Sequence, residues 1–190
     1  MTPRFSGFAI RGLFSVWLSR AMEHLAAEIN AEFPGTMWVS DHGTRPFNFG
    51  NVPWLTQQCA AIHAAGTKIV LIGHSFGATS AIMVTQNLCT LNVPVELLCP
   101  IDPAAQCTTT ITPNARRVIG FYQKTPGQLG QGIDAEGKGW SDADWRARTL
   151  DYRRDDSHLG IADEPFVHHT ILRELRSRFG QFAGASGPVG

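Results

Sequence analysis

The sequence has no excess of charge of either sign, and this sets the first limits on its function. Sixteen lysine and arginine residues balance sixteen aspartate and glutamate residues among 190, and charged residues make up only 17% of the chain. No basic stripe stands out, so nothing favours nucleic-acid binding. Hydrophobic residues make up 43% of the chain, which is enough to bury a proper core and too many for a disordered chain. The length suits one domain.

Long hydrophobic runs are also missing from the sequence. No window is long and apolar enough to cross a membrane. Residues 1–10 lack a basic stretch followed by an apolar run and a small-residue cleavage site. We therefore expect a cytoplasmic protein without a membrane span.

Cysteine is scarce, and none of the four cysteines belongs to a C-x-x-C pair. We interpret most of them as small, buried apolar residues. The sequence is compatible with a Cys99–Cys107 disulfide but does not require one. The H-E-x-x-H motif is missing as well, and we expect neither a metal nor a cofactor.

The most informative stretch is Gly73-His74-Ser75-Phe76-Gly77, which matches the pattern Gly-x-Ser-x-Gly. Residues 68–72 predict a short buried strand before it, and residues 78–91 predict a helix after it. A Gly-x-Ser-x-Gly between a strand and a helix is the signature of a nucleophile elbow. The turn lifts the Ser75 hydroxyl clear of the sheet and places it at a helix N-terminus, where N–H groups favour a developing negative charge. The alternative is a glycine-rich turn with an incidental serine, and the flanking strand and helix argue against it.

Strands and helices alternate along the rest of the chain. The predicted strands are 5–10, 36–40, 68–72, 94–101 and 117–122, and the predicted helices are 16–31, 51–65, 78–91 and 163–179. This alternation predicts an α/β fold: three α/β/α layers with a mostly parallel sheet of about five strands. We expect a single domain over residues 1–180. Residues 124–157 show no clear period and predict an irregular, lid-like insertion, and residues 181–190 predict a flexible tail.

An elbow serine needs a base, and the base needs a carboxylate that orients it. In this architecture the chain order is serine, then aspartate or glutamate, then histidine. His158 lies in a short loop just before the last predicted helix, from which an imidazole can reach the serine. His168 and His169 are the alternatives, but they fall inside that helix.

Asp102 is the preferred acid because it directly follows a buried strand, at the edge of the sheet where ligands bind in such folds. An Asp-Pro turn without a catalytic role is the alternative explanation. Four later carboxylates compete with it, and all of them lie in the irregular segment: Asp134, Asp151, Asp155 and Asp156.

The oxyanion of an acyl intermediate needs two backbone donors. One should be the N–H of Phe76, and the other should come from the loop after the first strand, where we expect Leu13 first and Phe14 next. Phe14, Trp140 and Trp145 are the residues that we expect to contact the substrate, with a tryptophan facing the acyl group.

Together the elbow, Asp102 and His158 resemble the α/β-hydrolase superfamily. The stretch Ile101-Asp102-Pro103-Ala104 is similar to the acid-bearing segment of pancreatic-type lipases, and this resemblance implies Asp102 as the third member of the triad. The resemblance covers roughly residues 5–179, and only the elbow in it is highly specific. The chain is short, without room for a helical cap domain or for two complete later strands. It looks closer to minimal, cutinase-sized hydrolases.

These observations predict a serine hydrolase that cleaves small-molecule carboxylic esters or thioesters through a Ser75–His158–Asp102 triad and an acyl-enzyme intermediate. Two other functions remain open at this point. One is an acyltransferase that uses the same triad, and the other is a non-catalytic binding module on a hydrolase scaffold.

Overall fold

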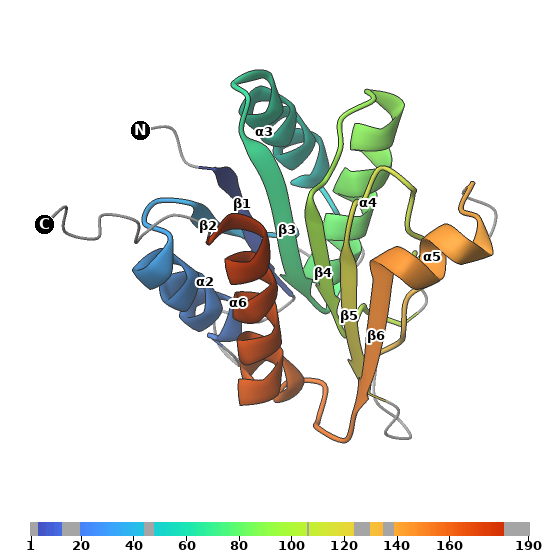
Figure 1. The fold of residues 1–190 in the computed structure, drawn as a ribbon. Coiled ribbons are helices and arrows are strands. Elements are labelled where there is room, and N and C mark those ends of the chain that lie inside the picture. Colours follow the sequence, from blue (N-terminus) through green and yellow to red (C-terminus); the bar gives the residue numbers. More distant parts are fainter. Residues whose placement is uncertain are drawn as a thin grey trace, which may run out of the picture.

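The computed structural model describes residues 4–12, 20–43, 48–105, 107–123, 130–134 and 139–180. Within these ranges six strands form one sheet in the order β2-β1-β3-β4-β5-β6, and every neighbouring pair is parallel (Figure 1). The strands are β1 (Phe5–Arg11), β2 (Met37–Asp41), β3 (Lys68–His74), β4 (Leu97–Ile101), β5 (Val118–Gln123) and β6 (Thr149–Arg154). The helices are α2 (Ala21–Glu32), α3 (Val52–Ala64), α4 (Phe76–Thr90), α5 (Asp142–Arg148), the short 3-10 helix η1 (Ile161–Asp163) and α6 (Pro165–Phe179).

Helices cover both faces of this sheet, which confirms the predicted α/β class and its layers. Helices α2 and α6 pack on one face, and α3 and α4 pack on the other (Figure 1). Strand β3 shows why its sequence is continuously apolar. Val70 and Ile72 belong to the core beneath α2 and α6, whereas Ile69 and Leu71 belong to the core beneath α3 and α4. Successive side chains point to opposite faces, so a strand covered on both sides needs apolar residues at every position.

The segment 124–157 differs from its prediction, because its described part contains α5 and the sixth strand instead of irregular chain only. Strand β6 pairs with β5 from Thr149 to Arg154 at the edge of the sheet. Leu150 and Tyr152 pack against the core, while Asp151 and Arg153 are exposed. A short alternating edge strand leaves a much weaker pattern than a buried one, and helix α5 buries none of its residues.

Other expectations fall partly or wholly outside the described residues. Helix α2 begins at Ala21, with Arg20 as its N-cap, and residues 16–19 of the helix predicted over 16–31 lie outside the described residues, as does the predicted tail over 181–190. The four cysteines are free thiols, with Cys59 and Cys99 buried. In the described part of the chain, no helix has both the length and the apolar character needed to span a membrane.

The strand order determines where a site can form. From β1 the chain passes through α2 to β2 on one side, and it then returns through α3 to β3 on the other side of β1. The connections therefore diverge between β1 and β3, and open parallel sheets bind ligands at the carboxyl ends of strands at such a point. Gly12 follows β1 there, and Ser75 follows β3.

Candidate active site

Ser75 stands at a sharp turn between β3 and α4. Its backbone has φ 57° and ψ −123°, which is a sparsely populated region for a residue with a side chain. The turn also needs both flanking glycines. A Cβ on Gly73 would overlap the Gly77 carbonyl, and a Cβ on Gly77 would overlap the carbonyl of Ile10 in β1. The backbone therefore has the geometry that the Gly-x-Ser-x-Gly motif predicts.

Three residues far apart in the sequence form one hydrogen-bonded chain at this turn. The Nε2 atom of His158 lies 2.9 Å from the Ser75 Oγ, and its Nδ1 atom lies 2.6 Å from Oδ2 of Asp102. A carboxylate only accepts hydrogen bonds, so the Nδ1–H of His158 donates to Asp102 and Nε2 is left to accept from the serine. The Asp102 side chain is completely buried, and 14% of the His158 side chain is exposed. The structure thus brings together the serine, the histidine and the acid selected from the sequence.

The carboxylate of Asp102 is fixed by its own backbone and by the neighbouring strand. Asp102 has a positive φ of 45°, and its N–H donates to the carbonyl of Phe121 in β5 at 2.6 Å. Its Oδ1 atom accepts from the backbone N–H of Gln123 at 3.1 Å, so Oδ2 is directed to His158. Gly130 closes over this carboxylate, because a Cβ at that position would overlap Oδ1. Sequence reasoning missed Gly130, one of many glycines in a segment without a periodic pattern.

The competing carboxylates occupy other positions in the structure. Asp134 accepts a hydrogen bond from a threonine hydroxyl at 3.3 Å, and Asp151 accepts one from a backbone N–H at 3.3 Å. Asp156 lies 3.6 Å from an arginine, and Asp155 is exposed. Asp102 is the carboxylate that the structure places against His158.

The two alternative histidines also lie elsewhere, on α6. His168 is buried, its Nδ1 lies 3.1 Å from a Glu28 carboxylate oxygen, and its Nε2 lies 2.9 Å from the carbonyl of Ala162. His169 is exposed. Their place within a helix explains why neither reaches the elbow.

The end of β1 approaches Ser75, and the residues predicted to supply the second oxyanion donor come directly after it. A Cβ on Gly12 would lie 2.9 Å from the Ser75 Cβ and 3.5 Å from its Oγ, so only glycine allows this approach. Phe76 is the first residue of α4, at the positive end of the helix dipole. Leu13 and Phe14, the two residues proposed for the second donor, lie outside the described residues.

Two aromatic rings pack around Phe76, the residue that directly follows Ser75. The Phe76 ring stacks on His42 with centroids 5.4 Å apart, and it lies 6.1 Å from the ring of Phe49. His42 and Phe76 are buried. His42 follows β2 and Phe49 precedes α3, so only the folded chain brings the three rings together at the carboxyl edge of the sheet.

The structure does not bring Trp140 and Trp145 to Ser75. Trp145 lies in α5, directly before β6, and β6 begins at the amino edge of the parallel sheet (Figure 1). Trp140 packs against Trp145 at 5.3 Å, and its Nε1–H donates to the carbonyl of Ile111 at 2.7 Å. The serine stands at the opposite, carboxyl edge. The expectation that a tryptophan faces the acyl group is therefore corrected, because both rings are partly buried against the core beneath α3 and α4.

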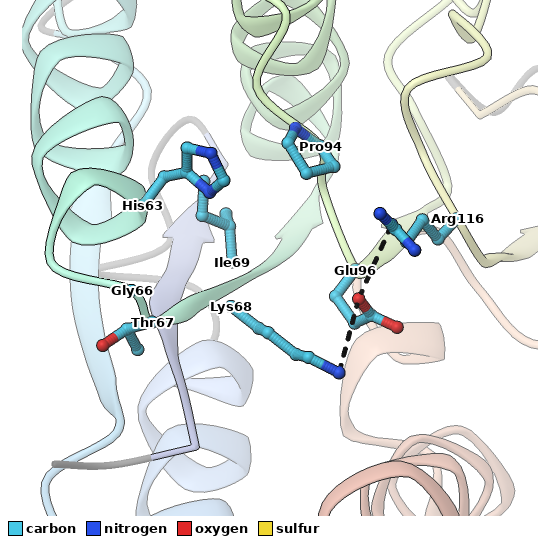
Figure 2. A pocket seen from close by; sticks show the side chains of 8 residues that line it. All are labelled: His63, Gly66, Thr67, Lys68, Ile69, Pro94, Glu96 and Arg116. Atoms are coloured by element: carbon cyan, nitrogen blue, oxygen red, sulfur yellow. Dashed lines mark ion pairs between the residues drawn. The ribbon is translucent and has the colours of Figure 1, made fainter.

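A cavity at the amino edge is also remote from the serine. Figure 2 shows that it opens where β3 begins, with Lys68 and Arg116 directed toward Glu96. The Nζ of Lys68 and the Nε of Arg116 lie 3.9 and 3.8 Å from a Glu96 carboxylate oxygen. Because β3 starts at this cavity and ends at His74, directly before Ser75, the whole length of the strand separates the cavity from the serine.

His74 is a second residue of the site that the sequence analysis did not select. It is the last residue of β3 and is almost fully buried, and its Nε2 lies 2.7 Å from the backbone carbonyl of His158. Burial, together with the nearby His158, lowers the pKa of His74 to about 4. The sequence contains no signal for this contact, because its acceptor is a carbonyl that every residue has.

Comparison with known proteins identifies the fold. No known protein family matches the chain as a sequence profile, and no curated protein matches it by sequence. Solved structures do match. A protein from Xanthomonas campestris pv. campestris, described as a hydrolase of the α/β superfamily, is 18% identical over 92% of this chain and 99% of its own, with a TM-score of 0.63.

Two other solved structures are similar over nearly their whole length. A cutinase-like protein from Cryptococcus sp. is 17% identical, with 95% of this chain and 97% of that chain covered and a TM-score of 0.54. Human thioesterase 2 is 9% identical, with 97% of this chain and 100% of that chain covered and a TM-score of 0.52. These likenesses establish that the chain has the α/β-hydrolase fold.

Proposed function

We propose that the protein is a serine hydrolase that cleaves carboxylic esters or thioesters through an acyl-enzyme intermediate. The observation that carries the proposal is the hydrogen-bonded chain from Ser75 through His158 to Asp102, at an elbow on the carboxyl edge of the sheet. A nucleophile, a base within hydrogen-bond reach and a group that orients the base are what this chemistry requires.

The first half of the reaction transfers the acyl group to the enzyme. The Ser75 Oγ attacks the acyl carbon while its proton passes to Nε2 of His158, 2.9 Å away. The resulting oxyanion is stabilised by the N–H of Phe76 and by a donor from the loop after Gly12, where Leu13 and Phe14 are the candidates. The tetrahedral intermediate then collapses, the bond to the leaving alcohol or thiol breaks, and His158 returns the proton to that group.

The second half releases the acid. A water molecule loses its proton to Nε2 of His158 and attacks the acyl-enzyme carbon, and the bond to Oγ then breaks as the proton returns to Ser75. Asp102 holds the imidazole in the tautomer with Nε2 free to accept, and it stabilises the imidazolium that forms twice in each cycle. Every step uses groups of this chain and water.

The rings of His42, Phe49 and Phe76 form our candidate wall for the acyl chain. Phe76 directly follows Ser75 in the chain, and the rings of His42 and Phe49 lie 5.4 and 6.1 Å from its ring. The names of the similar solved structures, which include a cutinase-like protein and thioesterases, support an acyl substrate. A small ester or thioester with an apolar acyl group is therefore the substrate class that we propose.

Covalent labelling tests the proposal directly. A fluorophosphonate should add one phosphonyl group to the purified protein, with Ser75 as the modified residue in peptide mass spectra. The Ser75→Ala variant should keep the fold, take up no label and lose on the order of 10⁶ in turnover of p-nitrophenyl esters. A wild-type protein that takes up no label, or a Ser75→Ala variant that keeps most of its activity, would contradict the assignment.

A further inference from the structure

The loop that carries His158 connects β6 to α6 at the carboxyl edge of the sheet (Figure 1). The side chain of His158 is held by Ser75 and Asp102, but its backbone belongs to a loop with neither helix nor strand geometry at that residue. A catalytic imidazole needs a fixed backbone, because a displacement of about 1 Å can cost on the order of 10²-fold in rate.

His74 fixes the backbone of His158 through a hydrogen bond. Its ring is buried, with 3% of the residue exposed, and its Nε2 lies 2.7 Å from the carbonyl oxygen of His158. A carbonyl only accepts hydrogen bonds, so Nε2 of His74 carries the hydrogen and donates it. The two imidazole rings also lie against each other, with centroids 5.1 Å apart and planes inclined by 38°.

The position of His74 in the chain adds to this contact. It is the residue directly before Ser75 and the last residue of a central strand. One residue thus joins the end of β3, which sets the position of the nucleophile, to the backbone of the base, which lies 84 positions further along the sequence. The positions of the nucleophile and of the base are therefore both set by the same end of strand β3.

The neutral charge of this donor also matters. His158 becomes an imidazolium during each half of the proposed reaction, and a cationic neighbour would disfavour that charge. A buried imidazole whose pKa lies at about 4 stays neutral at working pH and can still donate from Nε2. A lysine or an arginine at residue 74 would donate to the same carbonyl but would place a positive charge beside the base.

We propose that His74 is a positioning residue, which holds the His158 backbone so that the imidazole stays within hydrogen-bond reach of Ser75. This inference rests on the proposed serine-hydrolase function. In this role His74 neither contacts the substrate nor transfers a proton. The inference predicts that the turnover depends on the hydrogen bond that Nε2 of His74 donates.

Two amides that differ only in reach test this role. The side-chain nitrogen of His74→Gln reaches about as far as Nε2 of histidine, whereas that of His74→Asn stops about where Nδ1 lies. His74→Phe keeps a ring but removes the donor, and His63→Gln is the matched control at an exposed histidine on the opposite edge. Turnover of a p-nitrophenyl ester is normalised to the number of sites titrated by a fluorophosphonate, so a loss of folded protein does not lower the value.

We expect site-normalised kcat to fall about 10- to 100-fold in His74→Asn and His74→Phe, with KM changed less than about twofold. His74→Gln should recover most of the rate, and His63→Gln should equal the wild type. The downfield proton resonance of the His158 Nδ1–H, which reports its bond to Asp102, should shift or broaden in His74→Asn and be retained in His74→Gln.

Equal site-normalised kcat in the Asn, Gln and wild-type proteins would overturn the inference, and so would an unchanged His158 resonance in His74→Asn. A role in stability alone would lower the melting temperature without changing either readout. Failure of the proposed function is distinguishable, because the wild type would then take up no fluorophosphonate. The proton resonance would still test the attachment in that case.

Discussion

Oδ2 of Asp102 lies 2.6 Å from Nδ1 of His158, and the carboxylate is completely shielded from solvent. Its other oxygen accepts the backbone N–H of Gln123, so the carboxylate cannot turn without losing a second hydrogen bond. A buried carboxylate held in this way dictates which imidazole nitrogen carries the proton, and that choice leaves Nε2 directed at Ser75.

Replacement of Asp102 by asparagine should therefore reduce turnover sharply with the fold intact. The amide of Asp102→Asn can donate to Nδ1, which favours the tautomer with the proton on Nε2 and removes the acceptor for the serine proton. The comparable change in a well-studied triad costs about 10⁴ in kcat, and we expect a loss of that order here. Asp155→Asn and Asp156→Asn are the matched controls and should keep kcat within about twofold. If Asp102→Asn has nearly normal kcat and one of the controls is inactive, the catalytic acid is the residue replaced in that control and not Asp102.

Gly130 should tolerate no side chain, because a Cβ there would overlap the Asp102 carboxylate. We expect Gly130→Ala to destabilise the protein by about 1–3 kcal/mol, as overpacking usually does, and to lower kcat at least 10-fold by displacing the acid. Gly132→Ala is the control, because its Cβ would meet the end of the exposed Asp151 side chain at 2.9 Å and the Tyr122 ring at an ordinary contact distance of 3.7 Å. Denaturant unfolding and kcat measured on both variants check this, and equal behaviour of the two would contradict the placement of Gly130.

His74 should make the stability of the fold depend on pH. Burial lowers the pKa of His74 to about 4 from its ordinary value of 6.5, so between these values the unfolded chain binds a proton that the folded protein does not. The resulting stability is fully present above about pH 6.5, is lost as the pH falls toward 4 and changes no further below that. The loss is on the order of 3 kcal/mol. The measurement is the free energy of unfolding of the wild type minus that of His74→Gln across this range, and a difference that does not vary with pH would contradict the burial of a neutral imidazole.

Trp140 should contribute to stability and not to catalysis. Its Nε1–H donates to the carbonyl of Ile111, so Trp140→Phe removes one partly buried hydrogen bond and should cost about 1 kcal/mol of stability. Because the ring lies toward the amino edge of the sheet, kcat/KM on short and long p-nitrophenyl esters should stay within about twofold of the wild type. Phe49→Ala, beside Phe76, should instead change the preference between the two esters. A strong change of ester preference in Trp140→Phe would contradict this prediction and would indicate that Trp140 contacts the substrate.

The sequence by itself determined the parts of this protein that depend on local pattern. Gly73, Ser75 and Gly77 mark the elbow because the turn permits little else at those positions, and the continuously apolar residues before them mark a strand covered on both faces. The chain order of Ser75, Asp102 and His158 followed from the architecture, and the structure brings these three side chains into hydrogen-bond contact.

Only the tertiary structure decided which other residues surround that site. Strand β6 depends on pairing with β5, and its half-exposed sequence leaves little periodic signal. The tryptophans belong to the opposite edge because β6 is parallel to its neighbour, so the residues before it lie away from the carboxyl ends. Gly130 packs against the carboxylate of Asp102, and His74 contacts the backbone carbonyl of His158. In both pairs the partner is remote in the sequence and comes near only when the sheet assembles, so no local spacing predicts the contact.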